Sequence, residues 1–477
     1  MSLQDQIAID SASKLCDTAQ VKANLARTLL AALTNDCKAY CVLSGYDHLP
    51  DSFDTDIDFM VDSGDFDRMP QIIEGVAKKS NSKLFHTVGH ELSARSYSLG
   101  FQAGERLIIV QPDATADYRH FGLLWLRADE VLAGRRQHAN GLWIPAPPHE
   151  FAYYLIKRLN KRTFDAQHGL KLHRLYLKDP AGCDKMIARF WKGSSRTLLI
   201  RMASTNDWVR MEWGLEFIRS ELMRNSEESL VTRMASSPRH AIHHLRRMMM
   251  PTGGWIAIMG PDGAGKSVVI DAIQQQFRFA YDKVKCFHLR PKSLRRGAAT
   301  QQVVTNPHGK PPRSPLLSVL KILFMMADYW LGYALQIAPA MRRSQLIVFD
   351  RYIYDLLVDS KRVRYGGPQW LLRLAACLVP HPDMVILLDA PPDVLWARKR
   401  EVPFDEVMRQ RDEYCKLARS LPFATIVNAA QPLSDVIRDV DCAIVEHFER
   451  RTRERLRSKV GAVQTDHARV EAPRPQC

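Results

Sequence analysis

One loop holds the residues most clearly suited to chemistry. The stretch GPDGAGKS supplies Gly260, Asp262, Gly263, Gly265, Lys266 and Ser267. Glycines let backbone N–H groups turn inward around a phosphate, a lysine can span the β- and γ-phosphates, and a serine hydroxyl can hold Mg²⁺. The apolar run WIAIM before the loop predicts a strand, and VVIDAIQQQF after it predicts a helix, the context in which this motif binds phosphate. We therefore expect ATP and Mg²⁺ as cofactors.

A second candidate for magnesium follows about 80 residues later. The run LIVF ends in Asp350, which is the pattern of a buried strand that sets a carboxylate beside the metal. Many buried strands end in aspartate, so the pattern gains its meaning from the phosphate loop. Arg351 and Tyr352 follow at once and form an Asp-Arg-Tyr element.

The loop, the helix FMMADYWLGYALQIAPAMRR and the Asp-Arg-Tyr element together resemble thymidylate kinase over roughly residues 253–447. The resemblance implies that Arg351 grips the acceptor phosphate and that Asp262 contacts the acceptor sugar. It also implies that a basic lid closes over the transferring phosphate. The substrate-binding residues implied are Asp262, Arg290, Asp328, Arg351 and Tyr352, and the catalytic ones are Lys266, Asp350, Arg351, Arg398 and Arg400.

The lid is expected in RKREVPFDEVMRQR. This segment carries Arg398, Lys399, Arg400, Arg409 and Arg411. Phosphoryl transfer asks little covalent chemistry of a protein and much positive charge held in line, so mobile arginines there make physical sense. The alternative is a solvated basic helix.

Departures from the family bear on the acceptor. The usual Ala-Asp-Arg of the central helix is Ala327-Asp328-Tyr329 here, and no glutamine stands where the family reads the thymine ring. A charged loop replaces that element, with Asp359, Lys361, Arg362, Arg364 and Tyr365. A site that loses the partners of a base discriminates for it less. The predicted acceptor is a small molecule: a nucleoside monophosphate by resemblance, or a sugar, glycan or lipid-linked compound.

The N-terminal part holds a weaker constellation. Asp56 and Asp58 lie two apart on a predicted strand, so both point to one side, and Asp113 follows another strand. Such carboxylates can bridge two divalent ions. They resemble the polymerase-beta-like nucleotidyltransferases over residues 38–148, but the order Ser44-Gly45 after the first strand departs from the Gly-Ser usual in that superfamily. The alternative is a catalytically silent domain that binds or scaffolds.

The elements that position these residues fall into an α/β chain of four parts. Short runs rich in β-branched and aromatic residues predict strands at 40–45, 56–61, 83–88, 95–101 and 106–111, after a helix over 3–34. We expect a small mixed α/β domain over 1–148, a helical middle segment over 149–250, a doubly wound parallel-sheet domain over 251–449 and a basic mobile tail over 450–477. The basic insert at 291–315 is also expected to be mobile.

Composition narrows the class of protein and its partners. The 477 residues carry a net charge of +15, which favours anionic partners. Nine cysteines without metal spacing, and an N-terminus without an apolar signal core, predict a cytoplasmic protein with reduced thiols. Segment 322–340 is about long enough to span a bilayer, since roughly 20 apolar residues are needed, but Asp328 and Pro339 favour a buried helix.

Two partner questions stay open at this stage. Dimers are common in the resembling kinases, and no interface can be identified from the sequence. The basic middle segment and tail favour a second hypothesis, in which the chain binds RNA or DNA, or acts as a nucleotidyltransferase, and the phosphate loop only senses ATP. No RNA-binding signature supports it, and the Asp-Arg-Tyr and lid elements would then have no purpose.

Overall fold

The computed structural model describes residues 3–120, 123–208, 211–225, 250–294, 311–400 and 402–470. The chain divides into two compact units. The N-terminal unit comprises Met1–Ala103, Ile108–Leu245 and Leu456–Cys477, and the C-terminal unit comprises Gly104–Leu107 and Arg246–Arg455.

The C-terminal unit is built on a five-stranded sheet. Its strands are β10 (Gly254–Met259), β11 (Val284–His288), β12 (Leu346–Asp350), β13 (Met384–Asp389) and β14 (Ala424–Asn428), in the order β11-β12-β10-β13-β14. All neighbours pair in parallel, as the apolar runs predict. The three central strands are almost wholly buried, whereas β11 and β14 are edge strands with exposed polar positions. That mixed pattern is why neither edge strand stands out in the sequence.

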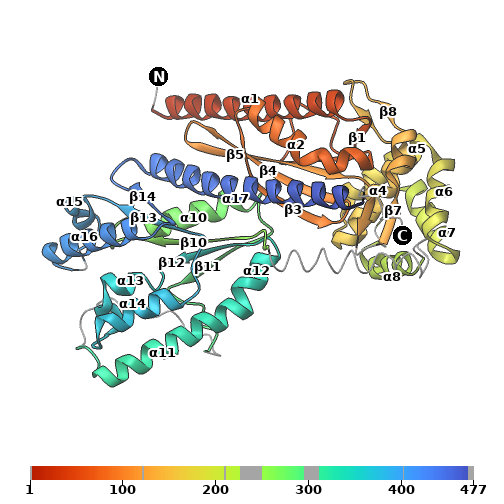
Figure 1. Ribbon diagram of the computed structural model, residues 1–477. Coiled ribbons are helices and arrows are strands. Elements are labelled where there is room, and N and C mark those ends of the chain that lie inside the picture. Colours follow the sequence, from red (N-terminus) through yellow and green to blue (C-terminus); the bar gives the residue numbers. More distant parts are fainter. Residues whose placement is uncertain are drawn as a thin grey trace. The chain divides into compact units, whose positions relative to one another are not determined.

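Helices cover both faces of this sheet. They are α10 (Lys266–Phe277), α11 (Pro315–Gly332), α12 (Ala338–Arg342), α13 (Asp355–Val358), α14 (Gln369–Leu378), α15 (Pro392–Arg398), α16 (Phe404–Ser420) and α17 (Leu433–Val470), with the π-helical turn η1 (Tyr333–Ile337) and the 3-10 turn η2 (Ser360–Val363). In Figure 1, α10 lies on the opposite side of the sheet from α11 and α14. The doubly wound arrangement brings the carboxyl ends of the strands to one edge, where such folds bind ligands.

Helix α11 departs from the expectation of a buried helix. Within the described residues, the continuous helical stretch Pro315–Arg342 is long and apolar enough to cross a membrane, and only 33% of its most apolar window is buried. One face packs into the core through Ile322, Met325 and Tyr329. The other face leaves Leu320 and Trp330 more than half exposed. The helix therefore carries apolar residues on both its buried face and its exposed face.

The N-terminal unit contains a mixed sheet. Its strands are β1 (Tyr40–Val42), β2 (Asp56–Val61), β3 (Lys83–Glu91), β4 (Ala94–Ala103) and β5 (Arg106–Thr115), in the order β1-β2-β5-β4-β3. Each of these five strands was predicted within a few residues. Strand β2 runs parallel to β5 and antiparallel to β1, and β3 pairs antiparallel with β4. Short pairs follow in β6 (Tyr118–His120) with β7 (Leu123–Leu126) and β8 (Arg136–Gln137) with β9 (Trp143–Ile144).

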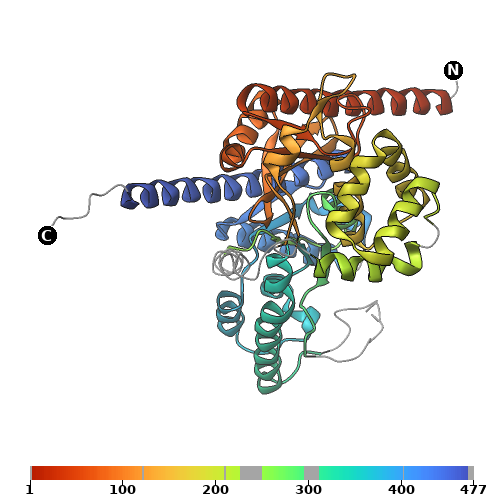
Figure 2. The same ribbon diagram turned by 90° about the vertical axis from the view of Figure 1, so that its right-hand side faces the viewer.

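The predicted helical middle segment belongs to this unit and does not form a separate domain. Its helices are α4 (Pro147–Lys161), α5 (Ala166–Lys178), α6 (Pro180–Phe190), α7 (Gly193–Thr205) and α8 (Met211–Arg224), which Figure 2 shows gathered together in yellow. Their apolar faces share one core with Leu43, Met60 and Trp125 of the strand region. The helices α1 (Leu3–Asp36), α2 (Ser63–Lys79) and α3 (Ala128–Ala133) complete the unit. Basic residues on the outer faces of α4–α8 conceal this shared apolar core in the sequence.

The C-terminal stretch is helical where a mobile tail was expected. Helix α17 continues through Arg450 as far as Val470. Arg453 pairs with Glu449 one turn earlier at 2.6 Å, and Arg451 pairs with Asp383 at 2.7 Å. Charged residues with good helix propensity and pairs at this spacing stabilise a helix with few apolar residues. Residues 295–310, most of the predicted mobile insert, lie outside the described residues.

Candidate active site

The phosphate loop joins β10 to α10 and requires its glycines. Gly263 and Gly265 both have φ of +86°, in the left-handed region that disfavours other residues. At Gly263, a Cβ atom would also lie 2.6 Å from the carbonyl oxygen of Leu395. The loop therefore passes close to α15 with its backbone exposed at the start of α10, as phosphate binding requires.

Lys266 folds back onto this loop. Its Nζ donates to the carbonyl oxygens of Gly260 and Pro261 at 2.8 Å each and lies 3.9 Å from a carboxylate oxygen of Asp262. Burial, followed by the charge of Arg351, lowers the pKa of Lys266 to about 7. The negative charge of a phosphate chain bound in the loop would stabilise the protonated form of Lys266.

Asp350 has one oxygen engaged and one unpartnered. Its Oδ2 lies 2.9 Å from Nδ1 of His288, which is its register partner on β11. Its Oδ1 is buried without a hydrogen bond. Burial alone would raise the pKa of Asp350, but the hydrogen bond with His288 and the nearby cations hold it below its usual value.

This arrangement fits Mg²⁺. The ion commonly takes one or two protein ligands and completes its shell with water and substrate phosphates. The free oxygen of Asp350 and the exposed Ser267, in the first turn of α10, would be those ligands. The unpaired buried oxygen is the observation that supports a cation here.

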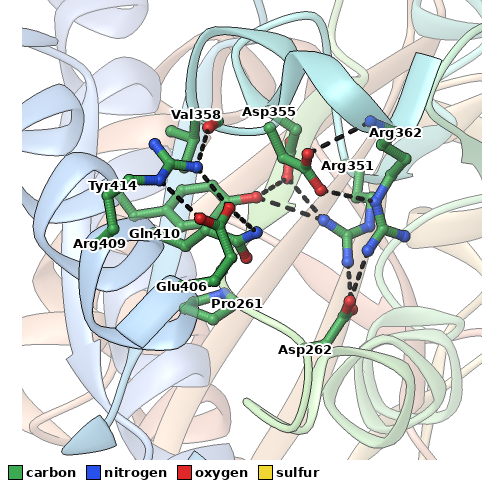
Figure 3. Close-up of polar contacts among 12 residues, drawn as sticks. Pro261, Asp262, Arg351, Asp355, Val358, Arg362, Glu406, Arg409, Gln410 and Tyr414 are labelled. Carbon is green, nitrogen blue, oxygen red and sulfur yellow. Dashed lines mark hydrogen bonds and ion pairs between the residues drawn. The ribbon is translucent and has the colours of Figure 1, made fainter. Parts of the chain in front are cut away.

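Arg351 is held in a buried network that Figure 3 shows. Its backbone has φ of +67°. The residue is 5% exposed, and Nη1 donates to Oδ1 of Asp355 at 3.2 Å and to the hydroxyl of Tyr414 at 3.3 Å. The Tyr414 hydroxyl donates in turn to Asp355 at 2.7 Å. Asp355 and Tyr414 were not predicted as site residues, although Asp355 stands four residues after Arg351, one helical turn away.

The carboxylate of Asp262 bridges two guanidinium groups. Its Oδ1 accepts from Arg351 and its Oδ2 from Arg362, each at 2.5 Å (Figure 3). Arg362 belongs to η2, in the charged loop that the sequence analysis singled out. The structure thus brings a residue of the new loop onto the same carboxylate as the arginine of Asp-Arg-Tyr.

The predicted lid residues are engaged locally and do not converge. Arg398 donates to the carbonyl of Ala429 at 2.8 Å, and Arg400 stacks on Trp396 with its Cζ 4.4 Å from the ring centroid. The remaining lid arginines are paired with acids, Arg409 with Glu406 and Arg411 with Asp389. Lys399 lies near the phosphate loop: a Cβ added at Gly263 would be 3.4 Å from the Cβ of Lys399.

Two predicted substrate contacts are core residues in the structure. Asp328 is fully buried and accepts from Arg290 at 2.9 Å and from the backbone N–H groups of Lys292 and Leu294. It therefore fixes the segment after β11 and does not face an acceptor. Tyr352 is also buried, and its hydroxyl donates to the carbonyl of Pro380. Arg290, which Asp328 orients, remains 17% exposed.

The three aspartates of the N-terminal unit do not form the expected metal group. Within the described residues, no cluster of three or more His, Cys, Asp or Glu side chains could hold a metal ion. Asp58 and Asp113 are register partners on β2 and β5. Lys157 of α4 donates to Asp58 at 2.6 Å, and Ser96 donates to Asp113. An ammonium group from α4, which could not be foreseen from strand spacing, takes the place predicted for a cation.

Asp113 should make the stability of this unit depend on pH. Burial, followed by the charge of Asp58, raises its pKa to about 7. An unfolded aspartate ionises near pH 4, so the folded state holds more protons between about pH 4 and 7 and loses stability as pH rises through that window. We expect Asp113→Asn to raise the free energy of unfolding by up to about 4 kcal/mol at pH 8 and to leave it unchanged below about pH 4.

Urea unfolding of the full chain at both pH values measures this difference. Asp67→Asn, at an exposed position of α2, is the control and should have no effect at either pH. If Asp113→Asn is equally stabilised at pH 4 and pH 8, or destabilised at both, then the folded protein does not disfavour the ionised form of Asp113.

Comparisons with known proteins agree with this geometry. The family model for thymidylate kinase matches residues 258–440. A probable thymidylate kinase of Thermococcus onnurineus (strain NA1) is 30% identical over 206 residues, which are 40% of this chain and 97% of that protein. A thymidylate kinase of Xanthomonas campestris pv. campestris (strain B100) is 26% identical over 46% of this chain and 92% of its own.

Among solved structures, thymidylate kinase from Ehrlichia chaffeensis is similar over 40% of this chain and 98% of that one, with 15% identity and a TM-score of 0.31. The matches leave the N-terminal unit unidentified. The parallel sheet, the phosphate loop and the near-complete coverage of the Thermococcus protein lead to one conclusion. The chain belongs to the thymidylate kinase family, with a P-loop kinase domain in its C-terminal part.

Proposed function

We propose that the C-terminal unit transfers the γ-phosphate of ATP to a small phosphorylated acceptor. The phosphate loop and Lys266 bind the nucleotide, and Arg351 orients the acceptor phosphate. Ser267 and Asp350 would hold Mg²⁺, which neutralises charge on the β- and γ-phosphates when bound. An acceptor oxygen forms a bond to the γ-phosphorus while the bond to the β–γ bridging oxygen breaks, and ADP leaves.

The bridging carboxylate of Asp262 is the observation that carries this proposal. Two arginines bind one anionic group of the phosphate loop. Planar guanidinium groups bind phosphate with the same geometry as carboxylate. An acceptor phosphate that displaces Asp262 from these arginines would lie next to the γ-phosphate, and Asp262 would be released to contact the acceptor's hydroxyl groups.

A nucleoside monophosphate is the acceptor that the relatives' names indicate, and a sugar phosphate is the alternative. The alternative is favoured by the charged segment over Asp359–Arg364, which stands where the family reads a base. A panel of nucleoside monophosphates, sugars and sugar phosphates, assayed for ADP formation with Mg²⁺, separates the two. The proposal predicts that one phosphorylated acceptor accelerates ADP formation and that Lys266→Ala abolishes the effect. It fails if no acceptor accelerates turnover while ATP still binds.

We also propose that the chain forms a homodimer through α11 and α14. Exposed apolar side chains on these packed helices include Leu316, Leu317, Leu320, Leu323, Phe324 and Trp330 of α11, and Trp370, Leu374 and Leu378 of α14. Exposed apolar side chains gathered on two packed helices indicate an interaction site. Homodimer interfaces are more apolar than ordinary protein surface.

Leu320→Glu combined with Trp330→Glu should convert a dimer to a monomer, because each substitution buries a charge in the proposed interface. Light scattering coupled to size-exclusion chromatography measures the mass. Leu177→Glu, at an exposed leucine of α5, is the matched control and should leave the mass unchanged. A wild-type chain that elutes as a monomer at all concentrations would refute the proposed interface.

Nucleotidyl transfer by the N-terminal unit stays a prediction from the sequence. Pyrophosphate release that Asp56→Ala abolishes and Lys266→Ala leaves intact would support it. The same result, without acceptor-dependent ADP formation, would favour the second hypothesis of a sensing phosphate loop.

A further inference from the structure

Four cationic side chains of the C-terminal unit lie close enough together for the charges of three of them to act on the fourth, Lys321. They are Arg290, which follows β11; Arg313, which precedes α11; Lys321 of α11; and Arg364, which follows η2. The Nζ of Lys321 donates to the carbonyl of Val363 at 2.6 Å, and the backbone N–H of Arg313 donates to the carbonyl of Arg364 at 3.0 Å. The guanidinium of Arg290 lies 5.4 Å from the ring centroid of Phe324, which follows Lys321 by three residues on α11. We call these four residues the cation cluster.

The cation cluster is poorly neutralised. Arg290 pairs with Asp328, but Arg313, Lys321 and Arg364 form no ion pair with any described residue. Burial, followed by the charges of Arg313, Arg290 and Arg364, lowers the pKa of Lys321 to about 8. The sequence from Lys283 to Ala327 contains no aspartate or glutamate, so the residues leading into α11 bring no counter-charge. A solvated basic surface would not place an ammonium group half-buried among three arginines.

Two members of the cation cluster are close in sequence to residues of the proposed active site. Arg364 comes two residues after Arg362, which binds Asp262, while its own Nε donates to the carbonyl of Pro311 at 3.0 Å. Arg290 comes two residues after His288, which binds Asp350. The short turn η2 therefore supplies Arg362 to the proposed site of phosphoryl transfer, and Arg364, directly after the turn, belongs to the cluster.

We propose that the cation cluster binds a second anionic group of the acceptor, remote from the phosphate that Arg351 and Arg362 hold. This rests on the proposed function and names its substrate class: a small sugar-like molecule with two anionic groups, in place of a nucleoside monophosphate with a neutral base. A phosphate or carboxylate between the four cations relieves their mutual repulsion, and guanidinium groups recognise either by paired hydrogen bonds. The cation cluster would then select the acceptor by its second negative charge, where a nucleoside monophosphate presents a neutral base.

Inorganic phosphate tests the cluster without any assumption about the acceptor's scaffold. The full chain is saturated with ADP to occupy the phosphate loop, and its melting temperature is followed against phosphate at constant ionic strength. Lys321→Gln combined with Arg364→Gln should weaken the apparent phosphate affinity by about tenfold or more, since charge-assisted contacts are lost. Arg373→Gln, at an exposed position of α14, should not change it. Unchanged phosphate affinity in the double variant would overturn the proposal.

A second arm ties the cluster to the acceptor. ADP formation is compared between glucose 6-phosphate and glucose 1,6-bisphosphate, with dTMP as the nucleoside reference. The inference predicts a lower KM for the bisphosphate than for either monophosphate, and loss of that advantage in the double variant. A preference for dTMP that the double variant retains would overturn the substrate class. If phosphate binds as expected and no compound accelerates ADP formation, the proposed anion site is supported and the proposed phosphoryl transfer is refuted.

Discussion

Lys266→Ala is expected to lower kcat by about 10³-fold, because removal of one preorganised charge from a transferring phosphate costs roughly two to three orders of magnitude. The ligand-free variant should nevertheless fold well. The ammonium is buried with its pKa lowered to about 7, so the folded state holds fewer protons than the unfolded state between about pH 7 and 10.5. Wild-type stability therefore rises with pH over that window.

The alanine variant lacks this proton linkage. Its melting temperature without nucleotide should exceed that of wild type at pH 7, and the difference should shrink toward pH 10. Lys416→Ala, at an exposed lysine of α16, is the control for both activity and stability. Full activity in Lys266→Ala, or a loss of stability at pH 7, would show that Lys266 has a structural role instead.

Asp355→Ala is expected to have the second largest effect, although Asp355 contacts no substrate in this account. Its carboxylate accepts from Arg351, Tyr414 and the backbone N–H of Tyr352, and it is 2% exposed. Removing one partner of a buried ion pair costs about 3–5 kcal/mol, because the other charge remains buried. We expect a loss near 3 kcal/mol and a roughly 10²-fold fall in kcat/KM as Arg351 loses its position.

Tyr414→Phe separates positioning from folding. It keeps the ring in the core and removes only the hydroxyl that binds Arg351 and Asp355. The expected result is near-normal stability with a raised KM for the acceptor and an unchanged KM for ATP. Glu413→Ala, an exposed neighbour on α16, should change neither constant. Equal changes in both KM values would mean that the network supports the whole fold and does not specifically orient Arg351.

The sequence predicted those parts of the fold that repeat a strong local pattern. The buried strands β10, β12 and β13 are continuous apolar runs, and the phosphate loop has fixed spacing, so both could be located from residues alone. Edge strands β11 and β14 carry polar residues at exposed positions and lack that signal. The apolar positions of α4–α8 gave no sign of the partner against which they pack.

The sequence motif located individual residues of the site, but it did not reveal the contacts that join them. Spacing located Lys266, Asp350 and Arg351, but the contact of Arg362 with Asp262 joins residues 100 positions apart. Asp328 was predicted as a substrate contact because of its place in the motif, but it is buried and accepts a hydrogen bond from Arg290. In the N-terminal unit, strand alternation placed Asp58 correctly, yet the charge that neutralises it comes from Lys157, 99 residues later. Such pairings depend on tertiary packing and leave no local trace.

The destination of the γ-phosphate is the most direct test of the kinase function proposed for the C-terminal unit. ATP labelled in the γ-phosphate is incubated with Mg²⁺, the full chain and each acceptor, and the products are separated. A kinase predicts label in the acceptor, at a rate that Lys266→Ala abolishes and Arg373→Gln preserves. Label found only in inorganic phosphate, with every acceptor unmodified, would contradict phosphoryl transfer and identify the phosphate loop as an ATP sensor.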